Sequence, residues 1–340
     1  MTQSCNQAKE WEERRDTANG YYKQGKFPEY LDLVKENLQL ARAISDRARE
    51  GHTLNDIGLA YLGCCQMQQA LDAFKQALAV AVELGNLQAE ATALSNVGST
   101  YSRIGKLSQA LEYLEKAAQI FREVQDTLGE VSTLNDVALI YIRLGEPKRA
   151  LLLQNQILAM RRLLGDFSGE ATTLNGIGFA YSILGDHEKA LEFLQAALPI
   201  QKATKNAVGE AITLNNIASI YIDIGQPKQA LLLYNQVLLS RRAMGDRSGE
   251  ANTLNNIGYI YNHLDIHRKA LKFYRQAVEI YQQQDDSIGE IATLLNMGSL
   301  YAKTKRKSLA RVCYQNAQQL AEEIADATIQ EKVKQFIDAL

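Results

Sequence analysis

The 340-residue sequence contains little that would interrupt a helix or mark a membrane, a leader or a disulfide framework. It has only four prolines, no Gly/Ser-rich or low-complexity stretch, and no apolar run as long as a membrane span needs. The polar start, MTQSCNQAKEWEERRD, lacks the apolar core of a secretory signal peptide. The four cysteines show neither metal-binding nor framework spacing, which fits reduced thiols and a cytoplasmic protein.

An excess of charge of either sign is also missing. The chain has 37 basic and 39 acidic residues and a formal net charge of −2. A mixed surface of this kind exerts no overall attraction on nucleic acid or on an anionic membrane, so we expect neither as a partner. The hydrophobic content of 46% is enough to bury a continuous core.

What the sequence does contain is one amphipathic helix restated every forty residues. GEATTLNGIGFAYSIL, GEAITLNNIASIYIDI and GEANTLNNIGYIYNHL begin at residues 169, 209 and 249. Leucine, tyrosine and alanine recur at the same period, without insertion, over 54–294, 61–301 and 70–310. Such a repeat indicates one array, because stacked copies bury apolar faces that a single copy cannot.

Each unit is predicted to form two helices. Apolar residues fall on one face of the first helix, as in Leu254, Ile257, Gly258 and Tyr261. The next unit begins with an aspartate or asparagine that can accept a free backbone N–H as an N-cap: Asp46, Asn86, Asp126, Asp166, Asn206, Asp246, Asp286 and Asp326. Glutamate follows in the first turn, where its negative charge suits the helix dipole.

Glycine marks two further positions in the unit. A glycine after the first helix is predicted to adopt the left-handed conformation that ends a helix: Gly105, Gly145, Gly185 and Gly225. Cys65, Asp265 and Lys305 replace it in other units, so we expect those turns to be less regular. Glycine within the first helix is costly and implies close approach of a neighbouring helix: Gly58, Gly98, Gly178, Gly258 and Gly298.

The two ends of the array depart from the regular copies, as capping requires. The atypical first repeat, 6–47, contains Trp11 and lacks the Leu-Asn-Asn core, and seven regular repeats fill 48–326. Residues 327–340 carry one apolar stripe and are predicted to form a closing helix: Ile329, Val333, Phe336, Ile337 and Leu340. We therefore predict an all-α fold and one array over 1–340, a right-handed superhelical solenoid of about eight two-helix units plus a C-terminal capping helix.

The pattern resembles the tetratricopeptide repeat. The bulky, small and aromatic positions of that family's signature match Leu254, Ile257, Gly258, Tyr261, Ala270, Tyr274 and Ala277. The usual unit has 34 residues; the longer unit is similar to the kinesin light chain and Pins/LGN type, and to bacterial arrays, often cyanobacterial, that are often fused to a caspase-like protease domain. The resemblance implies a concave groove that binds ligands. Because the chain ends at Leu340 after the closing helix, we expect no protease activity in it.

No catalytic or cofactor motif is evident. His263 and His267 have the spacing of a metal-binding pair, but a predicted turn separates them and no carboxylate completes the motif, so we interpret them as solvated turn residues. The adjacent Cys64 and Cys65 lack a Cys-x-x-Cys spacing. A GxG at 176–178 lies inside a predicted helix and follows no strand. We predict a protein without enzymatic activity, metal or cofactor.

The first helix of each unit leaves one arc that faces no other helix, and asparagines concentrate there. Their amides both donate and accept, so they could pair with the backbone of a bound peptide. Alternatively, they pair with each other or with neighbouring carbonyls and hold the repeats in register. Exposed apolar residues among them would be anomalous if the arc met only water. The predicted groove site comprises Asn135, Leu139, Asn175, Phe179, Asn215, Asn216, Ile222, Asn255, Asn256, Tyr259, Asn262 and Asn296.

Charge on this arc is sparse, with Asp136, Arg143 and Asp223 only, and it lacks the Lys/Arg set of carboxylate-clamp relatives. We therefore predict a non-enzymatic scaffold that binds a protein or peptide segment with apolar anchors, extended or helical, with weak self-association as a further possibility for the array. One alternative is a peptide-sensing regulatory receptor, although the helix-turn-helix head of similar bacterial proteins is missing. The other is a specificity subunit for a separately encoded enzyme such as a caspase-like protease.

Overall fold

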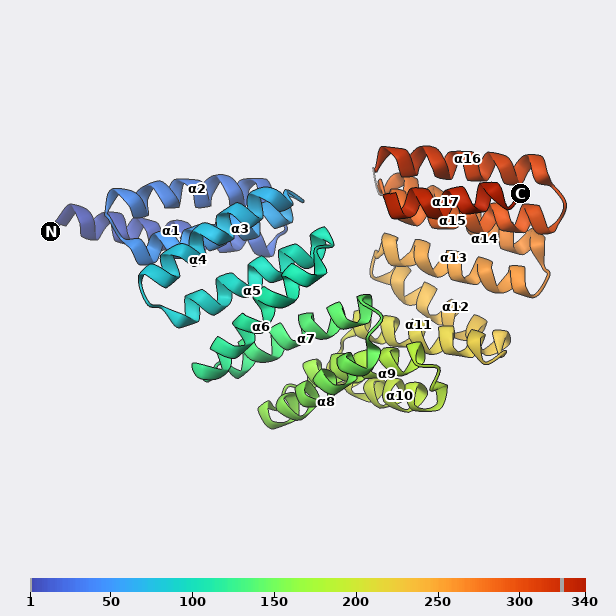
Figure 1. Cartoon of the computed structure of the whole chain (residues 1–340), viewed down its shortest axis with the longest axis horizontal. Helices are drawn as coiled ribbons and strands as arrows, with labels where there is room; N and C mark the ends of the chain where they lie inside the picture. The colour runs from blue at the N-terminus through green and yellow to red at the C-terminus, as the bar shows by residue number, and fades with distance from the viewer. Residues whose placement is uncertain (1, 325–326) are drawn as a thin grey trace. The chain divides into compact units, whose positions relative to one another are not determined.

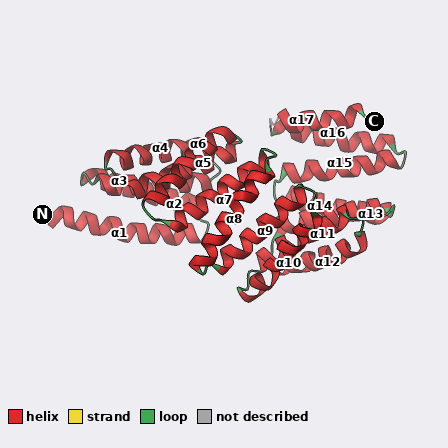
Figure 2. Cartoon of the chain, turned by 60° about the horizontal axis from the view of Figure 1, so that its bottom comes forward, coloured by secondary structure: helices red, strands yellow, loops and turns green. Residues whose placement is uncertain are grey.

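The computed structural model describes residues 2–324 and 327–340, with side chains from residue 6 to 324 and from residue 329 onward. Within these residues every regular element is an α-helix, and the seventeen helices follow one another in packed pairs (Figures 1 and 2). The all-α prediction is thus confirmed. The predicted N-cap Asp326 and the side chain of Cys5 lie outside the described residues. The chain divides into two compact units, which we describe separately.

The first unit, Met1–Asp166, contains eight helices among its described residues. They are α1 (Thr2–Lys23), α2 (Phe27–Ala43), α3 (Arg47–Gly63), α4 (Met67–Glu83), α5 (Leu87–Ile104), α6 (Leu107–Glu123), α7 (Thr127–Arg143) and α8 (Pro147–Leu164).

The second unit, Phe167–Leu340, contains nine helices in its described part. They are α9 (Phe167–Ile183), α10 (His187–Ala203), α11 (Ala207–Asp223), α12 (Pro227–Ala243), α13 (Arg247–His263), α14 (His267–Gln283), α15 (Ser287–Lys303), α16 (Lys307–Glu323) and α17 (Ala327–Asp338). In both units the odd-numbered helix is the first of each pair.

Side-chain caps begin the first helix of most repeats, as predicted. The Oδ1 of Asp246 accepts the backbone N–H of Gly249 at 2.9 Å. The same bond to the third following residue occurs at Asp46, Asn86, Asp126, Asn206 and Asp286. Each cap satisfies a backbone donor that the helix cannot pair internally, and fixes the residue at which the helix begins.

The turns after the first helices are uniform, so the expectation of irregular turns at Cys65, Asp265 and Lys305 is wrong. Their φ angles are 58°, 57° and 59°, in the same left-handed region as Gly145 at 74°. The backbone N–H after the turn residue bonds the carbonyl five residues back in both kinds of turn, at 2.8 Å for Gln66 to Tyr61. The repeat imposes this turn even where a side chain makes the left-handed conformation cost roughly 1–2 kcal/mol.

The glycines within the first helices lie against large side chains of the paired helix, which confirms the predicted close approach. A Cβ atom on Gly258 would lie 2.7 Å from the ring of Tyr274, and one on Gly298 would lie 2.2 Å from the ring of Tyr314. Tyr274 is fully buried. We call the residues that stand forty apart, at the same place in successive repeats, a column. The glycine column within the first helices therefore lets an aromatic ring of the second helix pack against the backbone of the first.

The closing helix is confirmed at the end of the second unit. Val333 is fully buried in a cluster formed with α14, α15 and α16. Ile329, Phe336, Ile337 and Leu340 pack against the same cluster. The ring centroids of Phe336 and Tyr314 are 5.7 Å apart. The last regular repeat thus has its apolar face covered.

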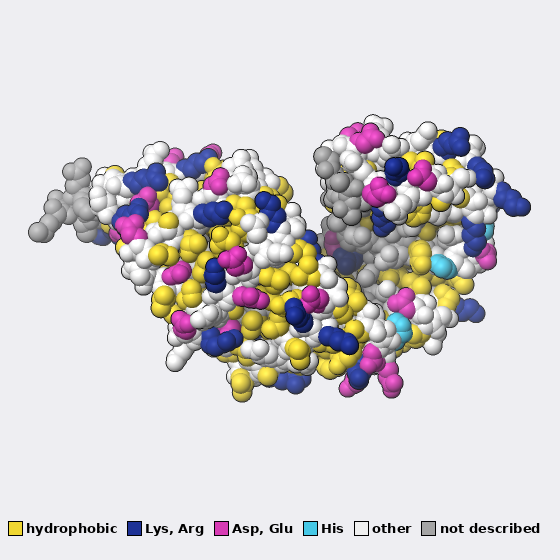
Figure 3. Space-filling model, in the orientation of Figure 1, with side chains coloured by type: hydrophobic (Ala, Val, Ile, Leu, Met, Phe, Trp, Pro, Cys, Tyr) yellow, Lys and Arg dark blue, Asp and Glu magenta, His cyan; other side chains and the backbone are white. Residues whose placement is uncertain are grey.

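The visible surface carries dispersed charge of both signs, with hydrophobic side chains gathered over α5 to α8 of the first unit (Figure 3). Within the described residues, no helix combines the length and apolar character needed to cross a membrane.

Candidate functional site: an asparagine-lined groove in the second unit

The second unit contains a cavity of about 490 Å³ on the arc that the sequence marked as free. Its walls come from the first helices of four successive repeats, α9, α11, α13 and α15, and from the second helices α10 and α12. We call this cavity the groove. Eight predicted site residues line it: Phe179, Asn215, Asn216, Ile222, Asn255, Asn256, Tyr259 and Asn296.

The groove asparagines form a ladder of hydrogen bonds between successive first helices. Nδ2 of Asn216 donates to Oδ1 of Asn175 at 3.0 Å. Nδ2 of Asn256 donates to Oδ1 of Asn215 at 3.4 Å, and Nδ2 of Asn296 donates to Oδ1 of Asn255 at 3.0 Å. The alternative in which asparagines pair with each other is therefore present in the structure. Each link joins residues 41 apart and so ties one repeat to the next in register.

Each ladder bond engages only one end of an asparagine amide. On α11, Asn215 uses its oxygen and Asn216 uses its nitrogen, so one Nδ2 donor and one Oδ1 acceptor remain side by side. Asn255 and Asn256 repeat the ladder bonds on α13, where Asn256 also forms a side-chain hydrogen bond with Tyr234. A peptide unit offers one carbonyl and one N–H, which is the complementary set. The links also restrict the rotation of the amides and so fix the direction in which their remaining polar atoms point.

Apolar side chains stand beside the ladder with much of their surface in solvent. Phe179 is 43% exposed and Tyr259 is 38% exposed, while Ile222 is half-buried. An aromatic surface of this kind can bury a large apolar area of a ligand with little loss of side-chain freedom. The ring of His263 packs edge-on against Tyr259 with centroids 4.4 Å apart, which gives that histidine a packing role.

The groove has a single carboxylate, Asp223, and no lysine or arginine in its lining. Asp223 lies near the hydroxyl of Tyr234, and burial, with a further contribution from Asp223, raises the pKa of that tyrosine above its usual range. Tyr234 thus stays protonated at neutral pH. The electrostatic character of the groove therefore disfavours an acidic ligand group.

Four predicted residues lie outside the groove lining. Asn135 and Leu139 belong to α7 of the first unit, where Leu139 is 50% exposed. Asn175 contributes as the acceptor of the ladder bond from Asn216. Asn262 lies beside the hydroxyl of Tyr274, with its own Oδ1 buried and without a hydrogen bond.

Sequence reasoning missed four residues of the lining, namely Ser182, Leu194, Ser219 and Tyr234. Ser219 and Ser182 stand forty and eighty residues before the predicted Tyr259 and Asn262, so the period of the repeat could have identified both. Leu194 and Tyr234 come from second helices, where the glycine or alanine of the paired helix lets them reach the groove floor. That contact depends on the packing of two helices and has no signal in one helix alone.

The remaining chemical candidates do not assemble into a reactive centre. In the part of the chain with described side chains, no three His, Cys, Asp or Glu residues come close enough to share a metal ion. His263 ends α13 and His267 begins α14, on either side of the predicted turn. Cys64 and Cys65 are free thiols. The GxG at 176–178 lies inside α9, as predicted.

Comparison with known proteins decides the family. The tetratricopeptide repeat profile matches residues 89–162, 169–243 and 249–323. The chain belongs to the tetratricopeptide repeat family. This tetratricopeptide repeat protein has no match among curated proteins.

Several solved structures share the fold at low sequence identity. The apo form of the quorum sensor NprR from B. thuringiensis has 16% identity and a TM-score of 0.71, and covers 85% of this chain and 82% of its own. Aspartyl phosphate phosphatase F from Bacillus subtilis has 12% identity and a TM-score of 0.67, with coverages of 91% and 93%. A putative kinesin light chain repeat array from Podospora anserina has 17% identity and a TM-score of 0.50, with coverages of 57% and 96%.

Proposed function

We propose that this tetratricopeptide repeat protein is a non-catalytic receptor for a peptide or an extended protein segment, held in the groove of the second unit. The observation that carries the proposal is that asparagine amides oriented by the ladder lie in one cavity with exposed Phe179 and Tyr259. The amides would bind the backbone of the segment at any sequence, and the apolar walls would select its side chains.

The composition of the groove also supports a non-catalytic role. Asp223 is the only carboxylate in the lining, and it has no histidine, cysteine or lysine beside it there. General acid–base or nucleophilic catalysis requires such a partner within hydrogen-bond reach. The similarity to a phosphatase extends to the fold, and activity has to be argued from a site.

We further propose that the twelve predicted residues take part in binding and that residues 1–340 are one repeat array, with 6–47 as an atypical first repeat, 48–326 as seven regular repeats and 327–340 as the cap. Register continuity supports this, since the forty-residue period passes residue 166 without insertion. A second candidate function is signal sensing, in which a short peptide shifts the array between two states. The similarity to a quorum sensor favours it at the level of the fold.

The test is selection of peptides from a random display library on the whole chain, followed by fluorescence polarisation with the best binder. Asn216→Ala and Asn256→Ala should each weaken binding, because buried peptide groups left unpaired cost about 1–3 kcal/mol each. Tyr259→Ala should weaken binding and also change which side chain the library selects at one position.

The matched control is Asn235→Ala on α12. Asn235 is also a helical asparagine, but it is exposed and bonds the carbonyl of Leu231 at 2.7 Å, away from the groove. It should leave binding unchanged. Peptides that bind the groove variants and the wild type equally well would contradict the proposal. If a bound peptide alters hydrogen exchange far from the groove, signal sensing is favoured over simple scaffolding.

A further inference from the structure

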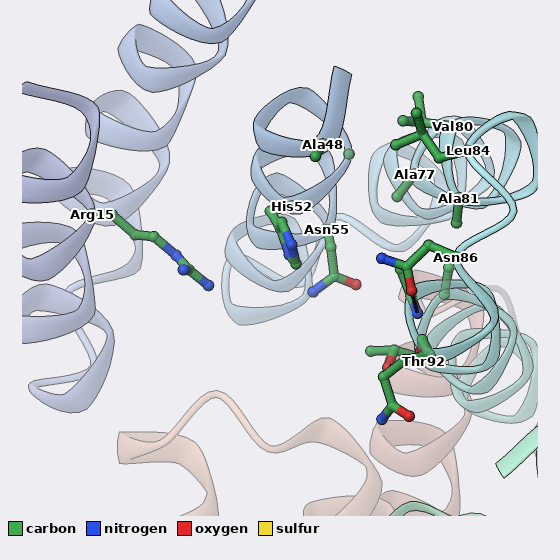
Figure 4. A pocket seen from close by; sticks show the side chains of 14 residues that line it. Arg15, Ala48, His52, Asn55, Ala77, Val80, Ala81, Leu84, Asn86 and Thr92 are labelled. Atoms are coloured by element: carbon green, nitrogen blue, oxygen red, sulfur yellow. Dashed lines mark hydrogen bonds between the residues drawn. The ribbon is translucent and has the colours of Figure 1, made fainter. Parts of the chain in front are cut away.

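The first unit contains a cavity of about 310 Å³ that the proposed function does not use. It lies among α3, α4 and α5, and Arg15 of α1 reaches its mouth. Figure 4 shows the Arg15 side chain extending toward His52 and Asn55 of α3, with the apolar residues of α4 on the opposite side. We call it the α3–α5 cavity. Its apolar wall consists of Ala77, Val80, Ala81, Leu84 and Ala93.

The cavity exists because this repeat departs from the others at two columns. At the column of Ala81, most later repeats carry a large side chain: Phe121, Arg161, Gln201, Arg241 and Tyr281. Phe121 and Tyr281 pack directly over Gly129 and Gly289. In this repeat Ala89 stands in the place of that glycine and Ala81 in the place of the aromatic residue. The methyl group of Ala89 fills much less space than the ring that is absent at Ala81.

The second departure lies on the facing helix. The column of Ala93 is threonine in every other regular repeat: Thr53, Thr133, Thr173, Thr213, Thr253 and Thr293. In one of them Nε2 of Gln201 donates to the Thr213 hydroxyl at 2.9 Å and closes the space between repeats. Ala81 and Ala93 together delete that pair. The two smaller side chains leave a space lined by apolar atoms, which suits the apolar part of a ligand.

Two asparagines of the cavity lining use their side-chain oxygens in hydrogen bonds. The Oδ1 of Asn55 accepts from Asn96 at 2.7 Å, and the Oδ1 of Asn86 accepts the N–H of Ala89 at 3.1 Å. Their Nδ2 groups have no hydrogen bond within the described residues. Thr92 already donates to the Gln88 carbonyl at 2.9 Å. The cavity thus offers amide N–H groups whose oxygens are engaged elsewhere.

Arg15 supplies the only formal charge of the lining, which contains no carboxylate. Its buried Nε forms an ion pair with Asp56, whose Oδ2 lies 3.7 Å away and outside the lining. The terminal guanidinium nitrogens make no further hydrogen bond within the described residues. A guanidinium whose two terminal nitrogens have no hydrogen bond matches a carboxylate in shape and in charge.

We propose that the α3–α5 cavity is a second binding site, for a small carboxylic acid with an apolar body. The carboxylate would lie between Arg15 and the Nδ2 groups of Asn55 and Asn86, and the apolar body would fill the space left by Ala81 and Ala93. The cavity volume lies at the lower end of the range for small-molecule sites, so the ligand is compact. The site is independent of the groove in the second unit.

The test uses 4-phenylbutyrate as the probe, with its neutral amide and acetate as comparators. Trp11 is the only tryptophan, and Arg15 lies over its ring with 5.4 Å between the guanidinium carbon and the ring centroid. The single indole N–H signal in an NMR spectrum of the whole chain therefore reports on the surroundings of Arg15. The guanidinium carbon of Arg49 lies 5.3 Å from the same centroid, so the Arg15→Gln variant is needed to assign a shift to Arg15. We expect 4-phenylbutyrate to shift it, with a Kd on the order of 1 mM or below for a ligand of this size.

Two variants fill the cavity in ways that the chain itself uses. Ala81→Phe with Ala89→Gly rebuilds the Phe121–Gly129 pair, and Ala81→Gln with Ala93→Thr rebuilds the Gln201–Thr213 pair. Either should fold, since each copies another repeat, and either should lower probe affinity at least tenfold. Arg15→Gln should remove the preference for the acid over the amide. The groove variant Asn256→Ala should bind the probe as the wild type does.

No shift of the indole signal at about 10 mM probe, or equal probe affinity in wild type and in a folded filled variant, would overturn the site. Equal affinity for acid and amide in the wild type would overturn the assignment of a carboxylate. Retention of probe binding in Asn256→Ala separates this site from the groove, so the failure of one proposal leaves the other standing.

Discussion

The α3–α5 cavity of the first unit and the groove of the second unit are made by opposite means. The groove arises by addition, because asparagines and aromatic residues are placed along the first helices of successive repeats, where part of their surface stays open to solvent. The α3–α5 cavity arises by subtraction, because two columns that normally close the space between repeats are reduced to alanine. A repeat scaffold permits both, since each repeat depends mainly on its immediate neighbours.

The prediction with the largest expected effect tests how far the last repeats depend on the helix that covers them. Deleting residues 328–340 removes the cover of the last repeat, including the fully buried Val333. Each large apolar side chain lost from the interface costs about 1.5–3 kcal/mol, so α15 and α16 should lose several kcal/mol of protection. Hydrogen exchange should show this loss in the second unit while α3 to α6 are unchanged, and the truncated chain should self-associate.

The control for the truncation is Lys334→Ala, which changes an exposed residue of the same helix. It should leave hydrogen exchange unaltered. A truncated chain that stays monodisperse and equally protected would show that the closing helix does not cap the array.

The second prediction concerns pH and affects the first unit alone. Burial raises the pKa of Asp56 to about 6, and the nearby Arg15 opposes the shift. A carboxyl whose folded-state pKa is raised binds its proton more tightly when folded, so its contribution to stability falls as pH rises from about 4 to 6. The upper limit is roughly 3 kcal/mol, since each pKa unit is worth about 1.4 kcal/mol.

The difference in unfolding free energy between wild type and Asp56→Asn, measured from pH 4.5 to 7, isolates this effect. Partial burial lowers the pKa of His52, which acts in the opposite direction and is common to both proteins. The unfolding free energy of Asp56→Asn, relative to that of the wild type, should increase as pH rises. A difference that does not vary with pH would mean that Asp56 keeps its ordinary pKa.

The third prediction compares two helical glycines. Gly298→Ala in the second unit places a Cβ 2.2 Å from the Tyr314 ring, and overpacking of this kind costs about 1–3 kcal/mol. Gly20→Ala in α1 meets no atom within 4 Å, so it should stabilise by about 0.5–1 kcal/mol through helix propensity. Urea unfolding of both variants checks the pair. A stabilising Gly298→Ala would show that the aromatic ring moves aside freely.

The prediction with the smallest expected effect separates the contribution of the ladder bonds to stability from the contribution of the groove asparagines to binding. Asn96 donates to Asn55 in the first unit as Asn256 donates to Asn215 in the second. Alanine at either position should cost about 0.5–1.5 kcal/mol of stability, the net value of one hydrogen bond. Only Asn256→Ala should also weaken binding of a selected peptide. If both variants bind it equally well, the groove asparagines hold register and nothing more.

The sequence predicted the elements that depend on local rules. The forty-residue period, the N-caps such as Asp246 and the mid-helix glycines such as Gly258 are all present, because each follows from the needs of one helix or one helix pair. The turns at Cys65 and Asp265 were predicted less well. Local propensity disfavours a left-handed residue with a side chain, and the packing of the flanking helices overrides it.

The candidate sites were predicted unevenly for a related reason. The exposure of Phe179 and Tyr259 follows from a helical wheel, whereas the bond from Asn256 to Asn215 requires the spacing between two repeats. The α3–α5 cavity was missed altogether. Its signal was in the columns, at Ala81 and Ala93, but only their facing positions in space give the two truncations a common meaning.

Acidic residues at the helix starts illustrate the same limit. Glu130 and Glu250 were expected to complement the helix dipole. They are also nearly buried, and each accepts a hydrogen bond from an arginine eight residues earlier, at 2.8 Å from Arg122 and 2.7 Å from Arg242. A helix end and a turn separate the partners, so no periodicity within one helix predicts the ion pair.

The ladder has a consequence for how such a chain changes length. Each link joins a residue to its counterpart one repeat away, and the donor and acceptor columns are asparagine in several consecutive repeats. Loss of one whole repeat from the second unit, such as residues 206–245, would bring Asn256 to Asn175 in place of Asn215. The same bond would form. Unequal exchange between repeats in the gene could therefore shorten or lengthen the array in steps of forty codons without creating an unpaired amide at the new junction.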